Sequence, residues 1–316
     1  MAPRTDDSLA ALLLTNHLTD TAGEPFGPKG FWDLAEVVGE PGRLLGMGRR
    51  EVVAVVGDDA LADRVLALLD ASTQLAFALE RFEAQGFSAV NPFDDAYPQR
   101  LRERLGGQAP PVLFTAGPVE LLTREAIGIV GSRNVGEAGS EVAEAAARTA
   151  VEGGFAVVSG GARGVDQSSM AATYQAGGAV IGFLAESLEK RVTAPDTRRV
   201  ILEGSVCLAT PFRPSAPFSV GSAMARNKLI YASARTTLVV ATDEGQGGTW
   251  EGAVEALRHR YGHVSVWRGD GEGPGNAALS AKGARPIETV EAILEEPDAS
   301  APEDPQNAPA QISLNL

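Results

Sequence analysis

Cysteine, histidine and long apolar runs are scarce in this chain of 316 residues, and each scarcity excludes a class of protein. The one cysteine, Cys207, rules out an internal disulfide, and its apolar neighbours in 205–209 predict a buried strand thiol rather than a nucleophile. No apolar run reaches the length of a membrane span, and the N-terminus lacks a basic region followed by an apolar one. We therefore expect a cytoplasmic protein without membrane contact.

Histidine offers no metal site. His259 and His263 are four residues apart, but Gly262 lies between them where a helix is ending, and no cluster of cysteines or carboxylates joins them. The motifs G-x-S-x-G and G-x-x-x-x-G-K-[ST] are also missing, which argues against a serine hydrolase and a P-loop ATPase. We expect neither a metal nor a cofactor.

Basic residues are outnumbered by acidic ones, 27 to 41, which gives a net charge of −14. This charge argues at first against a nucleic-acid partner. The acidic excess is unevenly placed. Residues 287–316 hold seven acidic side chains and no lysine or arginine, so half of the excess lies there. Residues 125–235 hold eleven basic and ten acidic side chains. This middle part of the chain can therefore form a local basic rim.

The pattern of apolar residues divides the chain into three regions. Alanine and leucine recur at helical spacing in the first region, where Ser8 is a possible N-cap. The helical segments are 8–18, 31–38 and 60–85, the last with a break near 71–73. We expect a small helical domain over 1–85, used for packing or dimerisation, and an α/β domain over 86–296. The acidic tail 297–316 is predicted to be disordered, with an apolar end, ISLNL.

Short apolar runs alternate with helical patterns through the second region. The predicted strands are 87–90, 112–114, 126–130, 155–158, 180–184, 206–209, 237–242 and 264–267. The predicted helices after residue 126 are 138–152, 167–176, 220–234 and 249–261. Such alternation predicts a Rossmann-like, mostly parallel sheet with helices on both faces, in which ligands bind at the carboxyl ends of the strands.

Two strand–turn–helix units follow one another in 126–179, and each turn combines glycine with one arginine. The first turn, 131–134, is not G-x-G-x-x-G, which disfavours NAD or FAD. Its hydroxyl, its arginine and the backbone N–H groups of the next helix suit a phosphate instead. The same holds for the second turn, 159–164. The candidate phosphate ligands are Gly131, Ser132, Arg133, Ser159, Gly160, Gly161 and Arg163.

Two later segments could complete this rim. Arg226, Asn227 and Lys228 place two cations and an amide on a predicted helix. Gly248 and Thr249 open another helix after a glycine-rich turn, where Thr249 is a good N-cap and the free N–H groups could contact a phosphate.

Six short motifs, taken in order, resemble the DNA-processing protein A family, DprA or Smf. They are YPQRLRE…APPVLFTAG (97–117), IVGSRN (129–134), SGGARGVD (159–166), ARNKLI (225–230), GGTWEGAVEAL (247–257) and KGARPI (282–287). The resemblance implies an extended Rossmann-type domain that binds single-stranded DNA without catalysis. It also implies delivery of the strand to a RecA-type recombinase, usually by a homodimer, in DNA uptake, recombination or a related defence role.

The chain departs from the family in several places. Ser169-Met170 stands where the family has Ala-His, 185–195 replaces a Gly-Leu-Asp…Tyr-Pro stretch, and Lys228 replaces the second arginine of R-N-R. An acidic tail stands where many members carry a winged helix.

Two other functions stay open at this point. The motif P-G-G-x-G-T-x-x-E of the related LOG-type phosphoribohydrolases is partly echoed, although Gly252 rather than Glu251 takes the position of its glutamate. A nucleotide sensor or N-glycosidic hydrolase would use the same rim, with Glu251 as the catalytic residue. A structural adaptor would instead recruit a partner through the tail 297–316.

Overall fold

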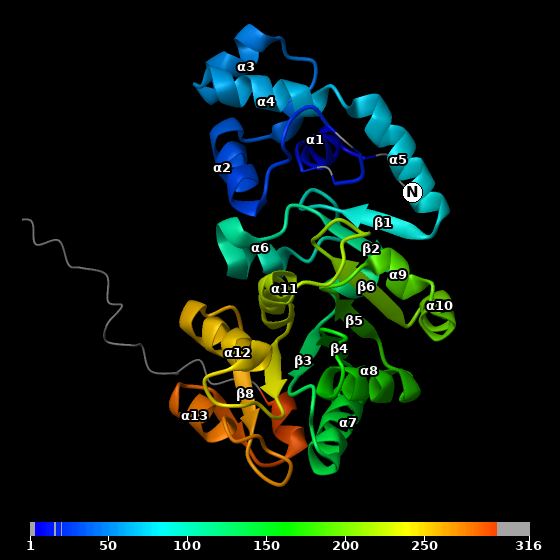
Figure 1. The fold of residues 1–316 in the computed structure, drawn as a ribbon, viewed down its shortest axis with the longest axis vertical. Coiled ribbons are helices and arrows are strands. Elements are labelled where there is room, and N and C mark those ends of the chain that lie inside the picture. The colour runs from blue at the N-terminus through cyan, green and yellow to red at the C-terminus, as the bar shows by residue number, and fades with distance from the viewer. Residues whose placement is uncertain (1–3, 16, 20, 296–316) are drawn as a thin grey trace, which may run out of the picture.

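A nine-stranded sheet, in the order β1-β2-β6-β5-β4-β3-β7-β8-β9, forms the centre of the computed structural model, which describes residues 4–15, 17–19 and 21–295 (Figure 1). The strands are β1 (Phe87–Val90), β2 (Leu113–Ala116), β3 (Ala126–Val130), β4 (Ala156–Ser159), β5 (Val180–Phe183), β6 (Val206–Thr210), β7 (Thr236–Val239), β8 (His263–Trp267) and β9 (Arg285–Ile287). The strands from β6 to β9 in this order pair in parallel, and β1 and β2 add an antiparallel edge beside β6.

The sheet order places a switch point at β3. From β3 the chain builds outward through β4, β5 and β6, then crosses back to place β7 on the other side of β3. In open α/β sheets, ligands bind where the strand order reverses in this way. The turns that follow β3, β4 and β7 meet at this point.

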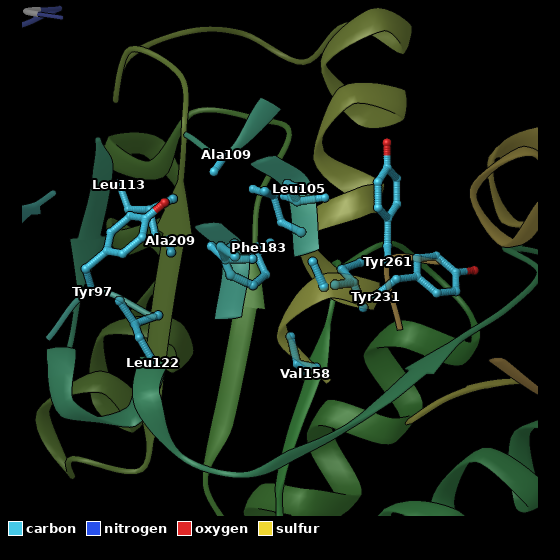
Figure 2. Packing of buried hydrophobic residues seen from close by; sticks show 14 of the residues in the cluster. Tyr97, Leu105, Ala109, Leu113, Leu122, Val158, Phe183, Ala209, Tyr231 and Tyr261 are labelled. Carbon is cyan, nitrogen blue, oxygen red and sulfur yellow. The ribbon is translucent and has the colours of Figure 1, made fainter. Parts of the chain in front are cut away.

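Helices cover both faces of the sheet. Their bounds are α6 (Gln99–Leu105), α7 (Glu137–Glu152), α8 (Val165–Gln175), α9 (Leu188–Val192), α10 (Pro195–Leu202), α11 (Val220–Ser233), α12 (Gly247–His259) and α13 (Asn276–Ala281). Ile127 and Ile129 of β3 pack against α7, whereas Ala126 and Val130 share a cluster with α11 and α12. This alternation follows from the two-residue period of a strand. Figure 2 shows part of the hydrophobic cluster that contains Ala126 and Val130, including Tyr231 of α11.

Five helices precede the sheet and gather at one end of the molecule (Figure 1). They are α1 (Asp6–Leu14), α2 (Pro28–Val38), α3 (Arg49–Val56), α4 (Asp59–Leu69) and α5 (Ser72–Ala84). They share hydrophobic clusters with the sheet region, and the Trp32 indole donates to the Ala109 carbonyl at 2.8 Å. The division into domains at 85/86 therefore stays a prediction.

The predicted fold class is confirmed, and so are the eight predicted strands and the break between α4 and α5. The short edge strand β9 was not predicted, nor were α3, α9, α10 and α13. The expectation that Ser8 is an N-cap was wrong: Thr5 caps α1 by accepting from the Ser8 amide at 3.1 Å, and the Ser8 hydroxyl donates to Asp94. The predicted tail lies outside the described residues.

None of the helices in the described ranges is long and apolar enough to cross a membrane.

Cys207 lies inside β6, and its prediction as a buried strand thiol is confirmed. Burial raises the pKa of this thiol to about 12. Only the thiolate reacts with disulfide reagents. We therefore expect a disulfide reagent to label the native protein at least roughly 100-fold more slowly than the urea-unfolded chain. A chain carrying Cys207→Ser and Ser215→Cys moves the thiol to an exposed loop and should label quickly; fast native labelling of Cys207 itself would contradict this placement.

Candidate functional site

Three turns meet at the carboxyl edge of the sheet and are joined by hydrogen bonds. They are the first turn (131–134) after β3, the second turn after β4 and the third turn (240–246) after β7. The second turn spans 160–164, because the structure places Ser159 in β4. The Ser132 amide donates to the Ala241 carbonyl at 2.8 Å, and the Arg163 side chain donates to the Asn134 amide oxygen at 3.1 Å. The first turn is thereby fixed on both sides.

The start of α12 and the middle of α11 extend this network. The Thr249 hydroxyl donates to the Gly131 carbonyl at 2.9 Å. The Asn227 side chain donates to the Gly248 carbonyl at the same distance. Predicted site residues from distant parts of the sequence are therefore in direct contact.

Two adjoining cavities open between these elements, and together we call them the groove. The first cavity, of about 340 Å³, lies between the first turn, α11 and the start of α12. The second, of about 290 Å³, lies between the second turn and the segment 185–191. Four residues line both cavities: Arg133, Ala162, Phe218 and Arg226.

The two cavities differ in charge. The charged residues of the second cavity are Arg133, Arg163, Arg191, Arg226 and Glu186. Glu186 forms an ion pair of 3.2 Å with Arg191, so the second cavity remains strongly positive. The first cavity balances two arginines with Asp166 and Asp243. An anion is therefore favoured in the second cavity.

Asp166 and Arg226 form the floor of the groove and are almost completely buried, at 5% and 4% exposed. One carboxylate oxygen of Asp166 accepts from the amides of Gly160 at 3.1 Å and Ala162 at 3.3 Å. Burial raises the pKa of Asp166, while the Arg226 charge and these amides act in the opposite direction. Burial likewise lowers the pKa of Arg226, against the charge of Asp166.

Buried polar atoms at this floor lack partners. Among the described residues, Nε and Nη1 of Arg226 and the hydroxyl of Tyr231 are buried without a hydrogen bond. Unpaired buried donors are costly, and native proteins rarely retain them without a purpose. Both residues line the first cavity. These buried groups of Arg226 and Tyr231 therefore remain without hydrogen-bond partners among the described residues.

Gly160 allows Arg226 to lie where it does. A Cβ at Gly160 would overlap Nη1 of Arg226, and a Cβ at Gly164 would overlap the Ser132 carbonyl oxygen. Gly164 also has a φ of +83°, which disfavours other residues. These two glycines therefore admit close contacts within the protein.

Most of the predicted site residues line the groove: Gly131, Ser132, Arg133, Gly160, Gly161, Arg163, Arg226, Asn227, Gly248 and Thr249. Ser159, Lys228 and Glu251 are not among the described lining residues. Ser159 is fully buried, and its hydroxyl donates to the Ile129 carbonyl at 2.6 Å. Lys228 donates to the Gln108 side chain at 2.7 Å.

Helix geometry explains two of these positions. Residues two apart on a helix point about 200° away from each other. Lys228 therefore cannot share the direction of Arg226, nor can Glu251 share that of Thr249. The expectation that Thr249 is the N-cap of α12 was wrong. The helix begins at Gly247, and Gln246 is its N-cap.

Several groove residues were not among the predicted site residues, and they include Asp166, Arg191, Phe218 and Tyr231. Asp166 stands in the motif SGGARGVD, and that position could have marked it. Tyr231 follows the apolar pair Leu229-Ile230 and reads as an ordinary core residue. Its orphaned hydroxyl is visible only in three dimensions.

Gly160→Ala should displace Arg226, because the new methyl group occupies the place of the guanidinium. We expect a loss of about 1–3 kcal/mol in the free energy of unfolding, as for other overpacked sites. Urea unfolding followed by circular dichroism measures it. Gly107→Ala, with open space around its added Cβ, is the matched control and should stay within about 0.5 kcal/mol of wild type. Equal stability of the two variants would refute the packing of Arg226 on Gly160.

The raised pKa of Asp166 predicts a pH dependence of stability. Above the ordinary carboxyl range, the unfolded chain loses this proton while the folded chain keeps it. The free energy of unfolding of wild type, relative to Asp166→Asn, should therefore fall by up to about 1.4 kcal/mol per pH unit until the folded-state pKa is passed. Urea titrations of both proteins from about pH 4 upward test this. A difference that grows with pH would mean that Arg226 outweighs burial and lowers this pKa.

Solved structures with a similar fold include two DNA-processing proteins. DNA processing protein A (DprA) from Streptococcus pneumoniae superposes with a TM-score of 0.70 at 21% identity, over 92% of this chain and 97% of that one. DNA processing protein A from Helicobacter pylori, described for its single-stranded DNA binding mode, gives 0.53 at 21% identity, over 66% of this chain and 94% of that one. At these identities the likeness establishes the fold.

Sequence comparison identifies the family. The putative DNA processing protein DprA of Mycobacterium tuberculosis H37Rv is 30% identical over 176 residues, which is 51% of this chain and 45% of that protein. DprA of Bacillus subtilis is 34% identical over 113 residues, 35% of this chain and 37% of that protein. The matches thus span less than half the length of these curated relatives. The family model described as DNA recombination-mediator protein A matches residues 88–298. The chain belongs to the DNA recombination-mediator protein A family, whose members are also named DprA or Smf.

Proposed function

We propose that the groove binds single-stranded DNA and holds backbone phosphates in the second cavity. The observation that carries this is the set of four arginines around one cavity, with the buried Nε and Nη1 of Arg226 still unpaired. Guanidinium groups match the geometry and charge of phosphate oxygens. The chain as a whole carries a net charge of −14, so four arginines around one cavity are a local concentration of positive charge.

Three observations favour DNA as the ligand. The chain belongs to a family of recombination mediators. Its structural neighbour from Helicobacter pylori is described as binding single-stranded DNA. An exposed aromatic ring, Phe218, also lines both cavities, and aromatic rings recur in proteins that bind unpaired bases.

Two of the three carboxylates that line the groove, Asp166 and Glu186, are engaged by other groups of the protein, which supports binding rather than catalysis. Asp166 accepts hydrogen bonds from the second turn, and Glu186 is paired with Arg191. Glu251, the catalytic residue of the alternative hydrolase, is exposed and is not among the described residues that line either cavity. We therefore infer a binding protein that performs no reaction on its DNA.

In this proposal the bound strand is passed to a RecA-type recombinase, and the protein acts as a homodimer. The recombination-mediator family supports this assignment. Sedimentation of the free protein tests the dimer. Strand exchange by a recombinase, with and without this protein, tests the transfer.

Binding of a free nucleotide is a second candidate, favoured by the unpaired Tyr231 hydroxyl in a cavity of about 340 Å³. A thermal-shift panel of nucleoside monophosphates and cyclic nucleotides separates the two functions. Stabilisation by a mononucleotide, without oligonucleotide binding, would favour this candidate.

Arg133→Ala with Arg163→Ala should weaken oligonucleotide binding and reduce its salt dependence. Each lost phosphate contact should lower the slope of log K against log salt by about 0.7 for a single strand. Fluorescence anisotropy of a labelled oligonucleotide between about 50 and 200 mM salt measures this, with a duplex of equal length in parallel.

Arg148→Ala is the matched control, because Arg148 is exposed on α7 and forms an ion pair with Glu144 away from the groove residues. It should leave affinity and slope unchanged. An unchanged slope in the double variant would remove the groove as the DNA site, and failure of wild type to bind single strands would refute the proposed function.

A further inference from the structure

Phe218 is an exposed aromatic side chain at the centre of the groove. It is 48% exposed, and Val220, two residues later, is 73% exposed. Large apolar side chains this open to solvent number five among the described residues, and these two both line the groove. Phe218 itself lines both cavities, so its ring stands where they adjoin.

The backbone holds this ring in place from both sides. Phe218 follows a loop with prolines at 211, 214 and 217. The Pro214 carbonyl accepts from the Ser187 hydroxyl at 3.1 Å and from the Glu189 amide at 3.2 Å. Ser219, the next residue, caps α11 by accepting from the Ser222 amide at 2.9 Å. A ligand that contacts the ring therefore meets a preorganised surface.

Arg133 links the ring to the positively charged part of the groove. The centre of its guanidinium lies 5.5 Å from the centroid of the Phe218 ring, within the range of a cation–π contact. Arg133 also lines both cavities. A phosphate bound by Arg133 would consequently have its own nucleoside within reach of Phe218.

We propose that Phe218 is a stacking surface for one nucleobase of the strand whose phosphate Arg133 binds. The inference rests on the proposed function and adds a contact that depends on the base. Every nucleobase presents an aromatic face, so this contact would strengthen binding with little sequence preference. It also accounts for an exposed aromatic residue beside the arginines of the groove.

An oligonucleotide and an abasic strand of the same length and charge test the proposal. Phe218→Ala should weaken binding of the oligonucleotide by roughly 10-fold and leave binding of the abasic strand unchanged. Phe218→Trp should bind the oligonucleotide at least as tightly as wild type, with quenching of the new tryptophan fluorescence. The salt slope should be the same in all three proteins, because stacking involves no phosphate.

Phe77→Ala is the matched control, since Phe77 is 64% exposed on α5 and should affect neither strand. If Phe218→Ala weakens binding of both strands equally, or of neither, Phe218 has no stacking role. The proposed function still holds in that case as long as wild type binds the oligonucleotide. A change in the sedimenting mass of Phe218→Ala without DNA would instead assign the ring to a protein contact. If wild type binds neither strand, the proposed function fails and the stacking surface fails with it.

Discussion

The groove depends on the placement of Arg226 against Gly160, above the buried carboxyl of Asp166. Removing a guanidinium and a carboxyl from water is costly, and here the cost is only partly offset. Asp166 satisfies two amides of the second turn, but Arg226 keeps unpaired donors. The floor of the site thus keeps buried donors of Arg226 without acceptors among the described residues.

The floor of the groove combines Asp166 of α8 with Arg226 of α11, two helices that are distant in sequence. The parallel order of β3, β4 and β7 brings the first, second and third turns to one edge, and α11 crosses above them. Each turn contributes mainly backbone and small side chains, and the hydrogen bonds between turns use up several of the groups that looked free for a ligand. Arginine side chains are left as the chief contacts for a phosphate.

Most of the fold could be predicted because buried parallel strands are continuous apolar runs bounded by glycine. The short strand β9 escaped because Arg285 and Pro286 interrupt its apolar character. In the site, the glycine turns could be located, but not which side chains face the groove. Lys228 shows why. Arg226, two residues earlier on α11, lies in the floor of the groove, whereas the rotation of the helix places the Lys228 side chain against Gln108. Arg191 lies in a segment without a recognisable motif, so only folding brings it to the second cavity.

The uneven charge has a consequence for the path of a bound strand. A chain with a net charge of −14 repels a polyanion wherever it presents carboxylates, while four arginines attract it along one short track. Under the proposed function, nucleotides beyond that track would meet no comparable cluster of arginines in the described lining of the two cavities. Under the proposed function, a strand bound in this way would stay accessible at its flanks to a second protein that assembles on it.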